Sequence, residues 1–136
     1  MHNAPPLGVM DWIGPALGAA LFVLAQSRLR EPARLRGNAL FAAGATGAYL
    51  SGGFGGWELL YPIVAAPIVY RALDSYRFVG VAWLMHAAWD LAHHLWGNAI
   101  WPFMPTSSFG CLIFDTTIAL WFLTSASAAR PARAAL

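Results

Sequence analysis

The segment FVGVAWLMHAAWDLAHHLWG, residues 78–97, is long and apolar enough to cross a bilayer, yet it carries four ionisable side chains. These side chains are His86, Asp90, His93 and His94. An ionisable group at membrane depth costs about 2.5–3.5 kcal/mol on insertion scales, and it usually faces a bundle interior, pairs with another group or takes part in chemistry. The segment therefore predicts both a membrane-spanning helix and the place of a functional site.

The composition of the whole chain also indicates a membrane protein. Of its 136 residues, 59% are hydrophobic and 10% are charged, whereas an ordinary soluble domain has about 25% charged residues. We predict a single all-α domain, residues 1–136, that forms a polytopic membrane bundle of five helices, each near the roughly 17–25 residues that a tilted span needs. The expected spans are Val9–Ser27, Asn38–Phe54, Leu59–Leu73, Phe78–Gly97 and Ser108–Ser125. The glycines of the second and the prolines of the third leave either one open to a kink or a partial crossing.

The basic residues test this count, because all eight are arginines and they fall in three segments, residues 28–36, 71–77 and 130–133. Five spans with the N-terminus outside and the C-terminus cytoplasmic place all three segments on the cytoplasmic side, as the positive-inside rule requires. The basic charge then meets anionic lipid headgroups, and a nucleic-acid partner is not needed to explain it. Glycine pairs at Gly14–Gly18 and Gly52–Gly56 leave a homo-oligomer open.

The four ionisable residues share one face of the expected helix, since successive helical residues advance about 100° and rise about 1.5 Å. His86 and Asp90 form an (i, i+4) pair, and Asp90 and His93 an (i, i+3) pair, so their side chains can touch. His94 lies at the edge of this face. With the predicted topology, Glu58 and Asp115 lie at similar depths, and we expect them to converge with the four in a polar cavity that opens to the outer side.

Histidine nitrogen and carboxylate oxygen are common ligands of zinc and non-haem iron. We therefore predict that His86, Asp90, His93 and His94 are metal ligands for a divalent ion, zinc or iron. Asp115 is a natural fourth ligand or general base, and Asp115 and Glu58 are the candidate catalytic residues. This set is typical of a metal-dependent hydrolase or oxygenase, here one that acts on a hydrophobic or lipid substrate within the membrane.

Three other functions fit the same residues. Because tryptophans accompany the cluster, a metal-free isomerase or cyclase could use a histidine and a carboxylic acid to protonate an olefin in a Trp-lined pocket. A transporter or sensor for metal ions or protons would need a polar path that continues inward from His86. A structural subunit of a larger membrane complex would use the cluster only for hydrogen bonds.

The stretch from Asn38 to Trp121 resembles a family of small bacterial integral-membrane proteins classified as a domain of unknown function. The resemblance is carried by GAYLSGGFGGWEL (47–59) and by YRFVGVAWLMHAAWDLAHHLWGNAIWPFMPTSSFGCLIFDTTIALW (76–121). Within them, the H-x-x-W-D-x-x-H-H-x-x-G-N block and the P-T-S-S-x-G-C segment are the most specific parts. The resemblance implies a multi-pass protein of the bacterial inner (cytoplasmic) membrane and supplies no activity.

Overall fold

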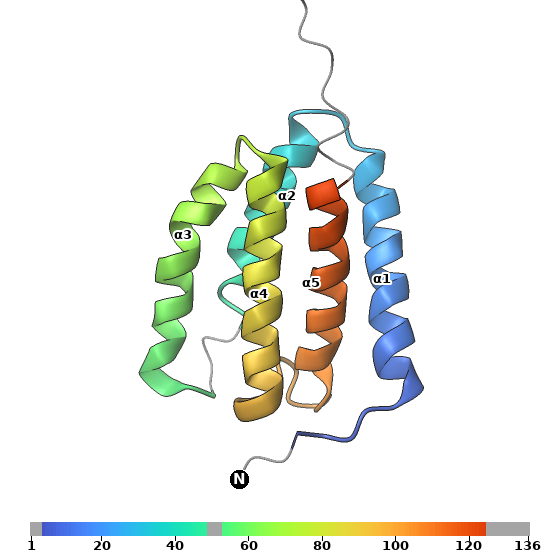
Figure 1. Ribbon diagram of the computed structural model, residues 1–136, viewed down its shortest axis with the longest axis vertical. Coiled ribbons are helices and arrows are strands. Elements are labelled where there is room, and N and C mark those ends of the chain that lie inside the picture. Colours follow the sequence, from blue (N-terminus) through green and yellow to red (C-terminus); the bar gives the residue numbers. More distant parts are fainter. Residues whose placement is uncertain (1–3, 49–52, 125–136) are drawn as a thin grey trace, which may run out of the picture.

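The computed structural model describes residues 4–48 and 53–124, which form five α-helices and one 3₁₀ helix with no β-strand among them (Figure 1). The elements are α1 (Val9–Ser27), α2 (Ala33–Ala45), η1 (Gly55–Leu59), α3 (Leu60–Ala72), α4 (Tyr76–Trp96) and α5 (Ser107–Thr124). The all-helical prediction is confirmed. The predicted glycine pair Gly52–Gly56 and the predicted span end at Ser125 each include a position outside the described residues.

Four of the five predicted segments agree with helices to within two residues at each described end, and α1 coincides with its segment. The second differs, because α2 begins at Ala33 and ends at Ala45 instead of running from Asn38 to Phe54. Pro32 is the N-cap residue of α2. Proline is tolerated at the start of a helix because its missing N–H would have no partner within the helix there. Glycine at 44 and 47 disfavours continued helix beyond that point.

Two described helices, α1 and α5, are long and apolar enough to cross a membrane. α2 and α3 contain 13 residues each, so each is about 20 Å long. This length is shorter than the roughly 30 Å hydrocarbon core of a bilayer. The five-helix bundle is therefore observed, whereas five complete spans stay a prediction.

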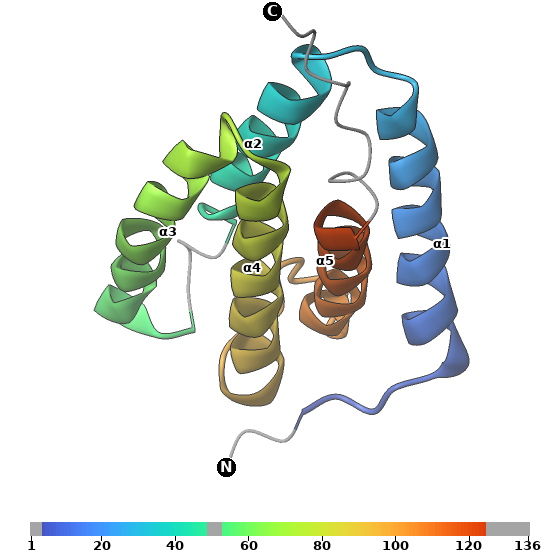
Figure 2. The ribbon, with the colours of Figure 1, turned by 45° about the horizontal axis from the view of Figure 1, so that its top comes forward.

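Successive helices run in opposite directions, and α4 lies at the centre of the bundle, in contact with α2, α3 and α5 (Figures 1 and 2). α1 packs on the other side of α5. The α1–α2 and α3–α4 connections lie at one end of the bundle, and the start of α1, η1 and the α4–α5 connection lie at the other. We call the first the arginine end, because all six described arginines lie in or next to its connections: Arg28, Arg30, Arg34, Arg36, Arg71 and Arg77.

The bundle has an apolar exterior and a partly polar interior. Large apolar side chains along the helices are exposed, among them Leu21 at 66%, Ile63 at 69% and Phe41 at 60%. Nine polar or charged side chains are buried among the described residues. They are Asn38, Glu58, His86, Asp90, His93, His94, Ser107, Ser108 and Asp115. The polar groups of this chain therefore gather between the helices, where they can bond to one another.

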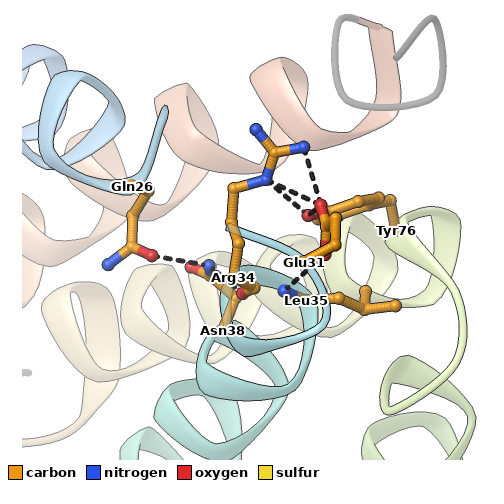
Figure 3. A network of polar contacts seen from close by, with 6 residues as sticks. All are labelled: Gln26, Glu31, Arg34, Leu35, Asn38 and Tyr76. Atoms are coloured by element: carbon orange, nitrogen blue, oxygen red, sulfur yellow. Dashed lines mark hydrogen bonds and ion pairs between the residues drawn. The ribbon is translucent and has the colours of Figure 1, made fainter. Parts of the chain in front are cut away.

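A polar network ties three helices together at the arginine end (Figure 3). Arg34 Nε donates to Glu31 Oε1 at 2.9 Å and to Tyr76 Oη at 2.6 Å, and Tyr76 Oη donates to Glu31. Asn38 Nδ2 donates to Gln26 Oε1 at 2.9 Å and so joins α2 to α1. These bonds hold the start of α2 against α1 and α4.

Replacing Glu31 with alanine removes the acceptor shared by Arg34 and Tyr76, so we expect a loss of about 1 kcal/mol at neutral pH. Burial opposes ionisation of Glu31, but the hydrogen bonds from Tyr76 and Arg34 outweigh it and lower the pKa of the carboxyl from its usual 4.5. The stabilisation is therefore present above pH 4.5 and is lost as the pH falls through the lowered pKa. Thermal melts of detergent-purified protein should show the difference between wild type and Glu31→Ala shrinking at acidic pH. A difference that stays constant, or an equal loss in Asp74→Ala at the same end, would contradict this role.

Candidate functional site

Helix α4 carries the four ionisable residues singled out in the sequence, and all four are buried. The helix is the most central element, so its one polar face lies against neighbouring helices. His86 and Asp90 meet α5, where Asp115 is also buried. His93 meets Glu58 of η1. The structure thus divides the predicted cluster into two groups along α4.

The first group consists of His86, Asp90 and Asp115. His86 Nδ1 lies 2.5 Å from Asp115 Oδ2 and 3.4 Å from Asp90 Oδ2. One ligand atom from each residue lies within 4.8 Å of the other two, and all three residues are buried. The two carboxylates therefore share one imidazole nitrogen in the bundle interior.

The other nitrogen of the His86 ring is held by a helix end. His86 Nε2 lies 2.8 Å from the carbonyl oxygen of Ala45, the last residue of α2. A carbonyl can only accept a hydrogen bond, so this contact places a proton on Nε2. Nδ1 and Asp115 Oδ2 lie 2.5 Å apart, and two lone pairs repel each other at that distance. A second proton or another cation must therefore lie between these two atoms.

The ligand types of this group suit a divalent cation. One imidazole nitrogen and two carboxyl groups are ligands that zinc and non-haem iron accept in proteins. The ligand spacing also fits, since atoms 2.0–2.1 Å from a tetrahedral ion lie about 3.3 Å apart, close to the 3.4 Å between His86 and Asp90. The His86–Asp115 contact must lengthen to accept an ion.

The second group is the pair of His93 and Glu58, and neighbouring backbone packs closely around the His93 ring. His93 Nε2 lies 3.2 Å from Glu58 Oε2, and Glu58 Oε1 accepts from the Phe54 backbone N–H at 2.9 Å. Gly53 has a positive φ of 96°, and a Cβ there would lie 2.9 Å from the His93 ring. A Cβ on Gly97 would lie 2.7 Å from His93 Nδ1. Glycine is thus needed on both sides of this imidazole.

Aromatic rings surround both groups. Tyr61 stacks on Trp89 with centroids 5.2 Å apart, and its ring lies 5.9 Å from that of His86. Trp83 meets the same imidazole edge-on at 6.1 Å. His94 is packed against Phe109 of α5, with ring centroids at 5.2 Å. The polar atoms of the site are therefore enclosed by apolar walls.

The sequence pattern placed His86 and Asp90 together, and it placed Asp115 beside them as a fourth ligand or base; the structure brings these three into one group. His93, also predicted as a ligand, lies with Glu58 instead, and His94 lies with Phe109. Sequence reasoning missed the Ala45 carbonyl and the Tyr61 ring. A backbone carbonyl has no sequence signal, and Tyr61 becomes informative only once α3 is docked on α4.

A model described as a family of unknown function, DUF6010, matches residues 10–128. No curated protein and no solved structure matches the chain.

Proposed function

Because the chain belongs to this family of unknown function, its activity has to be inferred from its own side chains, and we propose a metal-dependent enzyme embedded in a membrane. His86, Asp90 and Asp115 hold the divalent ion, zinc or iron. The substrate is a hydrophobic or lipid molecule. The chain is a multi-pass protein of the bacterial inner membrane with its arginine end in the cytoplasm.

The surface supports the membrane placement. Contiguous exposed apolar side chains on a protein mark a surface that is covered by something other than water, and here they cover the helices while polar groups are inside. The end opposite the arginines carries exposed tryptophans at 12, 57, 96 and 101. Arginines gathered at one end fit the positive-inside rule, and exposed tryptophans at the other end fit the enrichment of tryptophan at membrane interfaces.

The observation that carries the metal proposal is the buried group of three ligand atoms within 4.8 Å. A second feature supports it, because metal-binding histidines usually donate their other ring N–H to a carboxylate or backbone carbonyl, which sets the ring orientation. Ala45 provides such a carbonyl at 2.8 Å. His86 is therefore already oriented with Nδ1 toward both carboxylates.

When bound, such an ion supplies Lewis-acid chemistry and activates water. With an ion bound, His86 Nδ1 and the Asp115 carboxylate would serve as its ligands, and without one the two side chains hold a proton between Nδ1 and Oδ2. His93 lies further along α4 toward the tryptophan-bearing end, where it meets Glu58 of η1, and we assign proton exchange between the site and that end to this pair. Trp83, Trp89 and Tyr61 exclude water and provide apolar contact for a substrate.

The metal content of purified protein tests the proposal. Wild-type protein in mild detergent should retain about one equivalent of zinc or iron after dialysis, and His86→Ala should lose at least about 90% of it because the ligands act together. His94→Gln should retain the metal, since His94 does not belong to the group of three ligand atoms that lie within 4.8 Å of one another. A metal-free wild type, or equal content in His86→Ala, would contradict the site; loss in His94→Gln would contradict the three-residue ligand set.

A second candidate is favoured by the 2.5 Å contact between His86 and Asp115. Without a metal, this pair holds a shared proton inside an aromatic enclosure, which suits a metal-free isomerase or cyclase that protonates an apolar substrate. A metal-free wild type would support this candidate over the first.

A further inference from the structure

An apolar groove of about 560 Å³ lies along α2 and ends beside the group formed by His86, Asp90 and Asp115, which we call the metal group. Its lining residues are Gly37, Leu40, Phe41, Gly44, Ala45 and Trp83. We propose that this groove binds one acyl chain of an anionic membrane lipid, with the lipid headgroup at the arginine end and the chain directed toward His86.

The shape of the groove comes from two glycines. Gly37 and Gly44 are seven residues apart on α2, so they are separated by about 10 Å along the helix axis. A Cβ added at either position would meet no heavy atom within 4 Å. Leu40 and Phe41 lie between them and are 65% and 60% exposed. The result is an open apolar slot along α2, which suits an extended hydrocarbon chain.

Charge at one end of the groove selects the headgroup. Gly37 follows directly after Arg36, which is exposed, while Arg34 lies one turn earlier on α2. Arg34 is paired with Glu31 at 2.7 Å, whereas Arg36 forms no ion pair within the described part of the chain. A basic residue next to a membrane surface contributes about 1 kcal/mol toward anionic lipid. An anionic headgroup therefore complements this end better than a zwitterionic one.

The other end of the groove reaches the site. Ala45 lines the groove, and its carbonyl accepts from His86 Nε2. Trp83 also lines it, with its ring 6.1 Å from that of His86. A chain in the groove thus ends next to the imidazole that orients the metal group. The inference that the acyl chain is the substrate rests on the proposed function. The inference that the groove binds a lipid does not.

Photo-crosslinking in nanodiscs tests the groove. The probes are phosphatidylglycerol with a diazirine near the end of one acyl chain and phosphatidylcholine with the same chain. Mass spectrometry should map crosslinks to residues 37–45 and Trp83, about five-fold more with phosphatidylglycerol, as one basic contact of about 1 kcal/mol provides. Arg36→Gln should remove most of this preference.

Gly44→Leu fills the slot without a clash at Cβ, and it should reduce the labelling about ten-fold, since forcing atoms into occupied space costs about 1–3 kcal/mol. Gly14→Leu makes the same change at another open position, on α1, and should leave the labelling intact. Unchanged labelling in Gly44→Leu would overturn the groove, and equal labelling by the two lipids would overturn the anionic headgroup. Absence of label on wild-type α2 together with a dimeric mass would assign the groove to a second copy.

The variant Asp115→Asn separates this inference from the metal. Asp115 does not line the groove, so this variant should keep its lipid labelling while it loses bound metal. If wild-type protein binds no metal but its groove is still labelled, the proposed metal enzyme is contradicted and the lipid groove is not. If wild-type protein binds metal but Gly44→Leu leaves the labelling unchanged, the lipid groove is contradicted and the proposed metal enzyme is not.

Discussion

Asp115→Asn should be among the most damaging single substitutions in this protein, with loss of bound metal and a large loss of stability. The Asp115 carboxylate is buried and lies 2.5 Å from His86 Nδ1. Removing one partner of a buried ionic pair costs about 3–5 kcal/mol when the other partner is left without compensation. Asp90 stays 3.4 Å from His86 Nδ1 in this variant, so we expect a loss near the lower end of this range. The thermal midpoint in detergent, measured with and without added zinc, gives the effect. Zinc should raise the midpoint of wild type and should leave that of Asp115→Asn unchanged.

A double-mutant cycle supplies the control for this result. Once His86 is replaced by glutamine, the partner of Asp115 is gone, so adding Asp115→Asn should cost much less than it does alone. His94 lies on α4 with His86, but its ring packs on Phe109. The effect of His94→Gln should therefore add to that of Asp115→Asn. If the losses from His86→Gln and Asp115→Asn simply add, the two side chains do not act as one group.

Gly80→Leu should separate α4 from α5 and so damage both the fold and the metal group. A Cβ at Gly80 would lie 2.6 Å from Leu123 Cγ and 3.1 Å from the Ala119 carbonyl oxygen. Backbone cannot give way as a flexible side chain can, so we expect a cost at the upper part of the roughly 1–3 kcal/mol found for overpacked cores. Ala119 lies one turn after Asp115 on α5, and a shifted α5 withdraws Asp115 from His86. Bound zinc and the thermal midpoint should therefore fall together.

Gly14→Leu is the matched control, since it makes the same change on α1, where an added Cβ meets nothing within 4 Å. It should leave both the midpoint and the metal content near wild-type values. A Gly80→Leu protein that keeps its zinc would show that the close α4–α5 contact does not set the His86–Asp115 distance.

Local sequence patterns predicted the helices well where apolar runs are uninterrupted. α1, α4 and α5 agree with their predicted segments because long apolar stretches without internal glycine clusters have one favoured backbone state. The predicted segment for α2 was wrong by five residues at its start and nine at its end. A run of small residues and glycines has the hydropathy of an apolar span but a low helix propensity. Hydropathy alone does not distinguish these two cases.

The sequence by itself determined that the polar face of residues 86–94 must lie inside a helical bundle, because ionisable groups in an apolar segment require partners. It also placed His86 and Asp90 side by side through helical periodicity. Only the tertiary structure decided which partners they have, since contacts between helices depend on how α2, α3 and α5 dock on α4. That docking puts Asp115 on His86 and Glu58 on His93, and it brings the Ala45 carbonyl to the far side of the His86 ring. The six residues expected to converge in one cavity thereby form a three-residue group, a His93–Glu58 pair and His94 packed on Phe109.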